Sequence, residues 1–213
     1  RIPAPGETRL NLNPGCADPT VPCLIPTWRK QEWRSRDASF DEFQPKFTLS
    51  YQLADNATTF ASWGRGFKTG GFNPFGSGAL ISFFNPQTTV GDVFDKEVAE
   101  TFEVGLKMDL MDGRLKMNMG AFYTETENAQ LLEFFPASTL QAVSTAEAVD
   151  MYGGEVDVTF YPDAIPGLML YGGFGLLITE IAELEANPAF EGGDRPSTSP
   201  ITTNLAAHHT REL

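Results

Sequence analysis

The sequence predicts an all-β fold: an antiparallel up-and-down meander that forms part of a transmembrane outer-membrane β-barrel. Two observations lead to this prediction. Several segments alternate apolar and polar residues, and the connections between these segments alternate between short and long. Alternation with period two indicates strands, because successive side chains of a strand point to opposite faces. About seven strands are expected from the number of such segments.

The clearest alternating segments form a hairpin between Glu97 and Thr126. Its first arm places Phe102, Val104 and Leu106 on one face, with Glu and Lys on the other. The Asp112-Gly113 dipeptide between the arms favours a two-residue hairpin turn, because glycine tolerates a positive φ. Some apolar residues also fall four apart, as in a helix. A glycine inside the first arm, the turn and the unbroken alternation favour strands.

The remaining elements follow the same pattern. The other expected strands run over 47–53, up to 67, over 155–160, over 168–178 and from 201 onward. Short turns are expected at 54–57 and 161–167, and long connections at 68–95, at about 128–149 and at 182–200. Outer-membrane barrels have short turns at one end and long loops at the other. A β-sandwich of Greek keys has no reason to show this asymmetry.

Charge placement alone does not separate these two folds. In a barrel, the face with Phe102 and Leu106 meets lipid, whereas Glu103 and Lys107 face a wet lumen. The same charges would be ordinary on the outer face of a soluble all-β ligand- or carbohydrate-binding domain. That domain is therefore the alternative interpretation, and the asymmetry of the loops favours the barrel.

Composition excludes several classes of function. The 213 residues have a formal charge of −13 and are 41% hydrophobic, so the chain is not a disordered acidic tail. Nucleic acid is an unsuitable partner, because its phosphates would be repelled. The longest nearly unbroken apolar run, Leu168 to Ile178, is much shorter than the roughly 20 residues of a membrane-spanning helix. Any membrane crossing is therefore expected to use strands.

The first 35 residues are rich in proline and contain both cysteines, Cys16 and Cys23. A zinc site would need a closer pair of cysteines and further ligands nearby. A loop disulfide in an oxidising compartment and two unpaired thiols both remain open, with the disulfide favoured. Residue 1 is Arg1 rather than methionine, which fits a processed chain, a cytosolic protein or a piece of a longer one.

Three blocks of residues resemble the barrel of TonB-dependent outer-membrane receptors. Trp63-Gly-Arg-Gly-Phe-Lys-Thr-Gly-Gly-Phe-Asn-Pro74 is similar to a signature of that family. Glu103 to Tyr123 resembles its Glu-x-Gly-x-Lys hairpin with Gly-Arg-Leu at the turn. Tyr152-Gly-Gly-Glu-Val-Asp-Val158, followed by Pro166 to Gly175, looks like its next strand pair. Together they cover about residues 36–205 in the family's order.

The resemblance implies a Gram-negative receptor that imports a bulky, scarce nutrient through a plugged barrel of about 22 strands. A siderophore, a vitamin or an oligosaccharide would be its substrate, and a ferric siderophore is one example. Energy would come from the TonB complex. No TonB box, plug or terminal aromatic residue is present in these residues, so we expect a section of a longer receptor. Residues 1–35 would be a loop-like extracellular segment, and 36–213 a partial barrel.

The expected partners are outer-membrane lipid, the TonB complex through other regions, and a small-molecule substrate. No cofactor, metal or catalytic group is expected, and the chain is not expected to be an enzyme. Phenylalanines crowd two of the expected long loops and are the candidates for substrate contact: Phe72, Phe75, Phe83, Phe84, Phe134 and Phe135. The same residues would equally pack the loops together or join an interfacial aromatic girdle.

Two other groups have more ordinary explanations. Glu97, Glu100 and Glu103, with the aspartates before them, would suit a cation or an acid–base pair, but a solvated loop and lumen wall accounts for them better. The glycine-rich run from residue 64 to 71 has Phe67 directly before its lysine, where a phosphate-binding Walker loop needs glycine. His208 and His209 have no third metal ligand nearby in the sequence.

Overall fold

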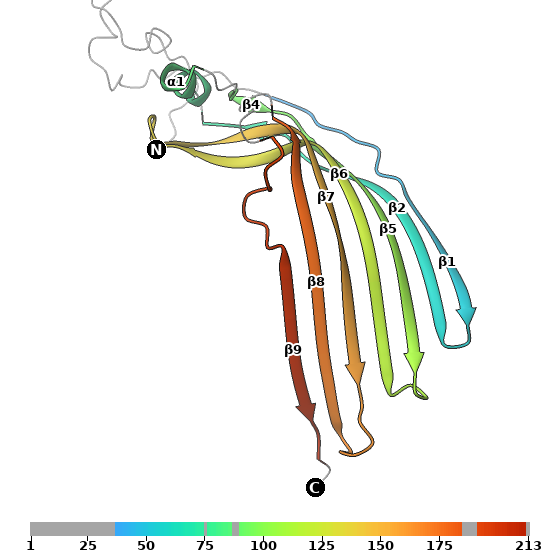
Figure 1. The fold of residues 1–213 in the computed structure, drawn as a ribbon. Helices are drawn as coiled ribbons and strands as arrows, with labels where there is room; N and C mark the ends of the chain where they lie inside the picture. Colours follow the sequence, from blue (N-terminus) through green and yellow to red (C-terminus); the bar gives the residue numbers. More distant parts are fainter. Residues whose placement is uncertain (1–36, 75, 87–89, 185–190, 212–213) are drawn as a thin grey trace, which may run out of the picture.

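The computed structural model describes residues 37–74, 76–86, 90–184 and 191–211. Figure 1 shows one long, curved, antiparallel sheet, which confirms the predicted meander. Its seven strands are hydrogen-bonded neighbours in chain order: β1 (Lys46–Ala54), β2 (Ala57–Lys68), β5 (Glu97–Leu110), β6 (Leu115–Phe135), β7 (Leu140–Phe160), β8 (Leu168–Glu183) and β9 (Ile201–His209).

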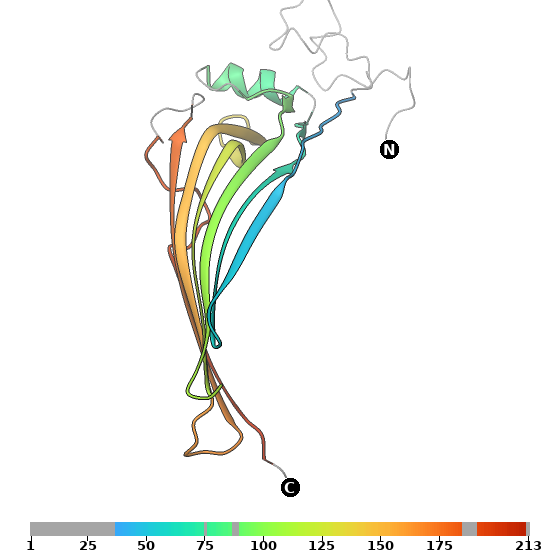
Figure 2. The ribbon, with the colours of Figure 1, turned by 90° about the vertical axis from the view of Figure 1, so that its right-hand side faces the viewer.

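Three turns lie together at one end of this sheet, which we call the turn end (Figures 1 and 2). They contain Asp55, Asp112 and Asp163, as predicted, whereas Phe135 lies at the opposite, outer end. Phe75 and Asn187 belong to the long connections expected at 68–95 and 182–200, and both lie outside the described residues. The up-and-down order thus holds for all seven strands of this sheet.

The predicted two-residue turn at Asp112-Gly113 is wrong in its length. Leu110 pairs with Leu115, so the turn takes four residues, three of which have positive φ. The guanidinium of Arg114 donates to the carbonyl of Met111 and to the carboxylate of Asp163. These side-chain bonds stabilise the wider turn.

The predicted long connection at 128–149 is also wrong. β6 and β7 continue through it as a paired arm and are joined by the tight turn 136–139. The strands bend at Asn128, which has a φ of 52°, instead of ending there. Beyond the bend, alternate residues such as Ala129 and Leu131 are buried, so the arm keeps one packed face. Figure 1 shows this arm turning away from the direction of the sheet.

The connection between β2 and β5 contains a small helix and a two-stranded ladder. Its elements are β3 (Gly71–Phe72), α1 (Ser77–Phe84) and β4 (Val93–Phe94). A Cβ on Gly71 would lie 2.7 Å from the ring of Phe94, so glycine permits this close approach. In the described part of the chain, no helix is both long and apolar enough to span a membrane.

Among the described residues, the buried apolar clusters lie at the outer end. Ala129, Leu131, Val149 and Ile181 form one buried cluster, and Ile81 of α1 packs with Phe135 in another. Nearer the turn end, no described layer packs over the middle of the sheet, and β1 and β9 are exposed along their full length. A sandwich would bury one face of these strands. The observed single layer is the form of a barrel wall.

Candidate functional site

One face of the sheet is apolar over most of its length. Strand register places Leu106 of β5 beside Thr59 and Met119, so that one parity of every strand shares this face. Exposed members of the face are Phe47, Leu49, Tyr51, Leu53, Phe102, Val104, Met119, Tyr123, Tyr152, Leu170, Phe174, Leu176, Ile178, Ile201 and Leu205. An exposed apolar surface of this extent indicates contact with an apolar environment.

Aromatic side chains form a row across this face. Register aligns Phe47, Trp63, Phe102, Tyr123 and Tyr152 on five successive strands. The rings of Phe47 and Trp63 stack with centroids 5.8 Å apart, and those of Trp63 and Phe102 are 6.4 Å apart. Aromatic residues favour the interface between a membrane and water. This row therefore has the composition of an interfacial girdle.

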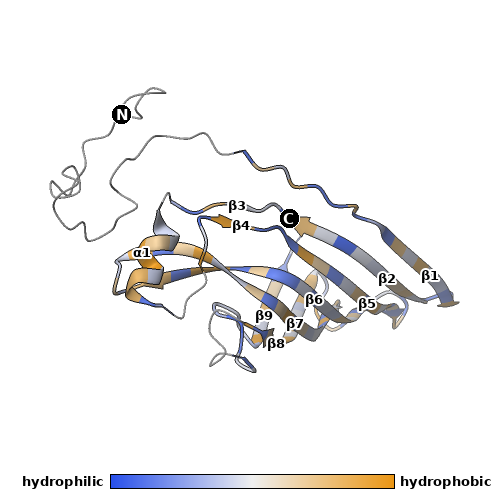
Figure 3. Cartoon of the chain, turned by 90° about the horizontal axis from the view of Figure 1, so that it is seen from above, coloured by the Kyte–Doolittle hydropathy of each residue, from blue (hydrophilic) through white to orange (hydrophobic). Residues whose placement is uncertain are grey.

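A row of charged residues follows directly beyond the aromatic row, toward the outer end. Register aligns Arg65, Glu100, Glu125, Asp150 and Glu180 on the same face. The hydroxyl of Tyr123 donates to Asp150 Oδ1 at 2.7 Å, which joins the two rows. Charges are costly in hydrocarbon. The apolar band therefore ends between these two rows. Figure 3 shows hydrophobic and hydrophilic residues alternating along the strands, as expected for a sheet with two different faces.

The opposite face is polar. Glu103, Lys107, Asn118, Glu155 and Asp157 line a shallow hollow of about 260 Å³ together with Phe60. Lys107 Nζ lies 5.8 Å from the centre of the Phe60 ring, and this ring covers Gly105. The hydroxyl of Tyr171 donates to Asp157 Oδ1 at 2.6 Å. These side chains suit a wet lumen, as predicted for Glu103 and Lys107.

At the outer end, one asparagine joins the α1 connection to the bent arm. The side-chain amide of Asn73 donates to the carbonyl of Val143 at 2.8 Å, and its oxygen accepts from the Val143 N–H at 2.7 Å. It also donates to the carbonyl of Gly91. Asp92 then accepts from the N–H groups of Gly76 and Gly78 at the start of α1. These bonds hold the helix against the free edge of β7.

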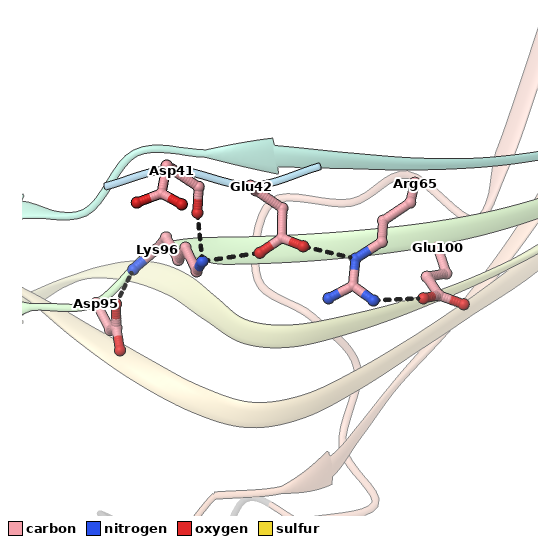
Figure 4. A network of polar contacts seen from close by, with 6 residues as sticks. All are labelled: Asp41, Glu42, Arg65, Asp95, Lys96 and Glu100. Atoms are coloured by element: carbon pink, nitrogen blue, oxygen red, sulfur yellow. Dashed lines mark hydrogen bonds and ion pairs between the residues drawn. The ribbon is translucent and has the colours of Figure 1, made fainter. Parts of the chain in front are cut away.

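An ion network, shown in Figure 4, ties the segment before β1 to β2 and β5. Glu42 forms ion pairs with Lys96 Nζ at 2.7 Å and with Arg65 Nε at 3.1 Å, and Arg65 also pairs with Glu100 at 3.0 Å. The hydrogen bond from Lys96, with the nearby Arg65 charge, lowers the pKa of the Glu42 carboxyl. The same bond raises the pKa of Lys96.

The structure does not gather the predicted aromatic contact residues into one site. Phe135 is buried against Ile81 of α1, and it serves packing. Phe134 is its neighbour on the strand, so it points to the opposite face and is 57% exposed. Phe83 and Phe84 form an edge-to-face pair on α1, and Phe72 is exposed in β3. Phe75, Cys16 and Cys23 lie outside the described residues.

The other candidate groups have structural partners. Glu97 accepts from the Gln130 N–H, and Glu100 pairs with Arg65. His208 bonds to Thr210, and His209 bonds to the Pro166 carbonyl. Within the described ranges, no three potential metal ligands come together.

Sequence reasoning missed the role of Asn73. The available signal was its position between Gly70-Gly71 and Pro74, because glycine and proline mark turns in a sequence. Its partner Val143 lies in a segment that the sequence suggested was a loop, so the contact could not be anticipated.

Comparison with known proteins connects this geometry to a family. A family model described as TonB dependent receptor-like, β-barrel, matches residues 24–212. The metal-pseudopaline receptor CntO of Pseudomonas aeruginosa is 26% identical over 161 residues, which are 74% of this chain and 20% of the relative. This chain therefore spans about one fifth of the length of the curated relatives it matches.

Solved structures share the fold. The ferric yersiniabactin uptake receptor FyuA from Yersinia pestis aligns with a TM-score of 0.54 and 19% identity, over 79% of this chain and 23% of that chain. The ferripyoverdine receptor of the outer membrane of Pseudomonas aeruginosa aligns with a TM-score of 0.54 and 16% identity, over 81% of this chain and 21% of that chain. Both alignments establish the architecture of the sheet as a section of such a barrel.

Proposed function

The chain belongs to the TonB-dependent receptor-like β-barrel family, and on this premise we propose that it forms part of the wall of a receptor for active uptake of a scarce, bulky nutrient. Members of the family are outer-membrane proteins of Gram-negative bacteria, which places the chain in that membrane. The relatives are transport receptors rather than enzymes. We propose that this chain likewise has no catalysis of its own.

The observation that supports the proposal is the pair of aligned rows on the apolar face. Each row crosses five neighbouring strands in register, and the charged row lies directly beyond the aromatic row, as a barrel wall needs where it leaves the bilayer. The polar opposite face would then line the lumen. The long connections and the bent arm would lie on the extracellular side, where outer-membrane barrels carry their longer loops.

The two end strands support a larger assembly. In the described sheet, β1 and β9 each pair on one side only. Each unmet backbone group inside lipid costs several kcal/mol, so we propose that these edges pair with further strands of the same receptor. A siderophore, vitamin or oligosaccharide would enter from the outer end. The TonB complex would act through other parts of the receptor, and residues 1–35 would belong to an extracellular loop.

Uptake by the complete receptor tests this function. Cells with and without the receptor, each in TonB-containing and TonB-deficient backgrounds, are given labelled ferric siderophores, cobalamin and oligosaccharides. We expect one of these solutes to accumulate only when both the receptor and TonB are present. Accumulation that is independent of TonB would contradict active uptake, and a receptor absent from the outer-membrane fraction would contradict the barrel assignment.

A further inference from the structure

The negative charge of the chain is concentrated at the outer end. We count this end as the charged row and the described residues beyond it: 37–45, 65–74, 76–86, 90–100, 125–150, 180–184 and 191–200. These residues contain sixteen carboxylates and four basic side chains, a net charge of −12. The remaining described residues contain seven carboxylates and five basic side chains, a net charge of −2. The potential at this end therefore attracts cations.

Basic groups at this end are already used in part. Arg65 and Lys96 both pair with Glu42, and Arg65 also pairs with Glu100. The guanidinium of Arg195 lies 3.7 Å from the sulfur of Met151. An anionic ligand would have to compete for these few basic groups and overcome the repulsion of the surrounding carboxylates, whereas the net charge of this end attracts a cation.

The same end exposes apolar and aromatic surface. One face of the bent arm carries Leu132, which is 70% exposed, and Phe134. Phe83 and Phe84 add an edge-to-face pair on α1, with ring centroids 5.2 Å apart. Aromatic faces attract cations through the ring quadrupole, and they also provide contact area for an apolar ligand. Charge and aromatic surface thus favour the same kind of ligand.

We propose that the outer end of this chain docks a ligand that carries a positive charge together with an apolar or aromatic part, with Phe134 as a contact residue. This inference rests on the proposed uptake function and specifies its substrate class. The receptor would select against polyanionic complexes by electrostatic repulsion.

Two probes of similar size test the sign of the charge. The complete receptor is placed in lipid nanodiscs, and phenyltrimethylammonium and benzenesulfonate are titrated in turn while binding is followed by saturation-transfer NMR, with empty nanodiscs subtracted. We expect the cation to bind about tenfold more tightly than the anion at low salt, and this preference to shrink toward high salt as the charges are screened.

Two matched double variants locate the effect. Glu183→Gln with Asp194→Asn removes two exposed carboxylates from the outer end, whereas Asp55→Asn with Asp112→Asn removes two from the turn end. We expect the first variant to reduce the preference for the cation and the second to leave it unchanged. We also expect Phe134→Ala to weaken binding of the cation about threefold, which corresponds to the loss of one aromatic contact.

Three results would overturn the inference: tighter binding of benzenesulfonate, binding of neither probe, or equal effects of the two double variants. A receptor that imports its solute through TonB and yet prefers the anion would disprove the inference and leave the uptake function intact. A receptor that imports nothing and still prefers the cation would contradict only the uptake function.

Discussion

Asn73 makes with its side chain the two hydrogen bonds to Val143 that a neighbouring strand would make with its backbone. Its amide thereby covers the edge of β7 beyond the last residue that pairs with β8. Asn73 is 7% exposed, so these bonds are shielded from water. These bonds join the segment that leads into α1 to the bent arm.

Asn73→Ala is expected to loosen the arm without unfolding the barrel. The substitution leaves the Val143 N–H and carbonyl without these partners, at a cost of about 1–3 kcal/mol for each group that stays buried. Hydrogen exchange of the complete receptor should accelerate at residues 140–147 and stay unchanged in β5. Asn73→Asp retains the acceptor only and should give an intermediate rate. Equal exchange in the wild type and both variants would show that the hydrogen bonds between Asn73 and Val143 are not needed to hold the arm.

Gly153→Ala and Gly120→Ala form a matched pair on neighbouring strands. A Cβ on Gly153 would lie 2.2 Å from the carbonyl oxygen of Leu176, a backbone atom that cannot turn aside. On Gly120, the nearest atom would be 3.7 Å away, in ordinary contact. Urea unfolding of the receptor in detergent should show a loss of about 2 kcal/mol or more for Gly153→Ala, because overpacking forces backbone shifts. Gly120→Ala should be close to neutral, and similar losses for both would refute this packing argument.

Leu106→Arg should impair membrane assembly, whereas Lys107→Gln should be mild. Leu106 lies on the apolar face and Lys107 on the polar face of the same strand. A charge near the middle of the bilayer costs roughly 2–4 kcal/mol on a lipid-facing position. The amount of heat-modifiable receptor in outer membranes measures the effect. Equal tolerance of both substitutions would argue against a lipid-facing wall.

The Glu42–Lys96 contact should respond to pH at both extremes and not between them. The pKa of Glu42 is lowered from 4.5, so its contribution is present above that value and is lost as pH falls through the lowered pKa. The pKa of Lys96 is raised from 10.5, so its contribution is present below that value and is lost as pH rises through the raised pKa. Protease accessibility of residues 37–45 should therefore increase only in strong acid or strong base. Glu42→Gln should make it high at neutral pH as well, and a wild-type change between pH 6 and 9 would contradict this assignment.

Residues 36–213 expressed alone with outer-membrane targeting should aggregate or be degraded. Strands β1 and β9 would each expose an unpaired edge, which promotes association between chains. Protease resistance and heat modifiability of the expressed segment measure this outcome. A stable monomer that imports solute would show that the sheet needs no further strands.

Alternation along the sequence was sufficient to predict the seven strands of the sheet near the turn end and the faces on which their side chains lie. Phe102 and Leu106 lie on the apolar face and Lys107 on the polar face because period two leaves no other arrangement once the strand is known. The family resemblance of the Trp63–Pro74 block was confirmed by the family match. Both results depend only on residues that are close together in the sequence, so the sequence alone is enough to obtain them.

Only the tertiary structure decided how these strands combine at the outer end. The continuation of β6 and β7 beyond Asn128 depends on burial of Leu131 against Val149 and Ile181, which are distant in the sequence. The aromatic and charged rows depend on register between strands, and one residue of shift would move each side chain to the other face. The bond from Asn73 to Val143 joins residues seventy positions apart. Such contacts arise from packing and pairing between segments, and no local pattern specifies them.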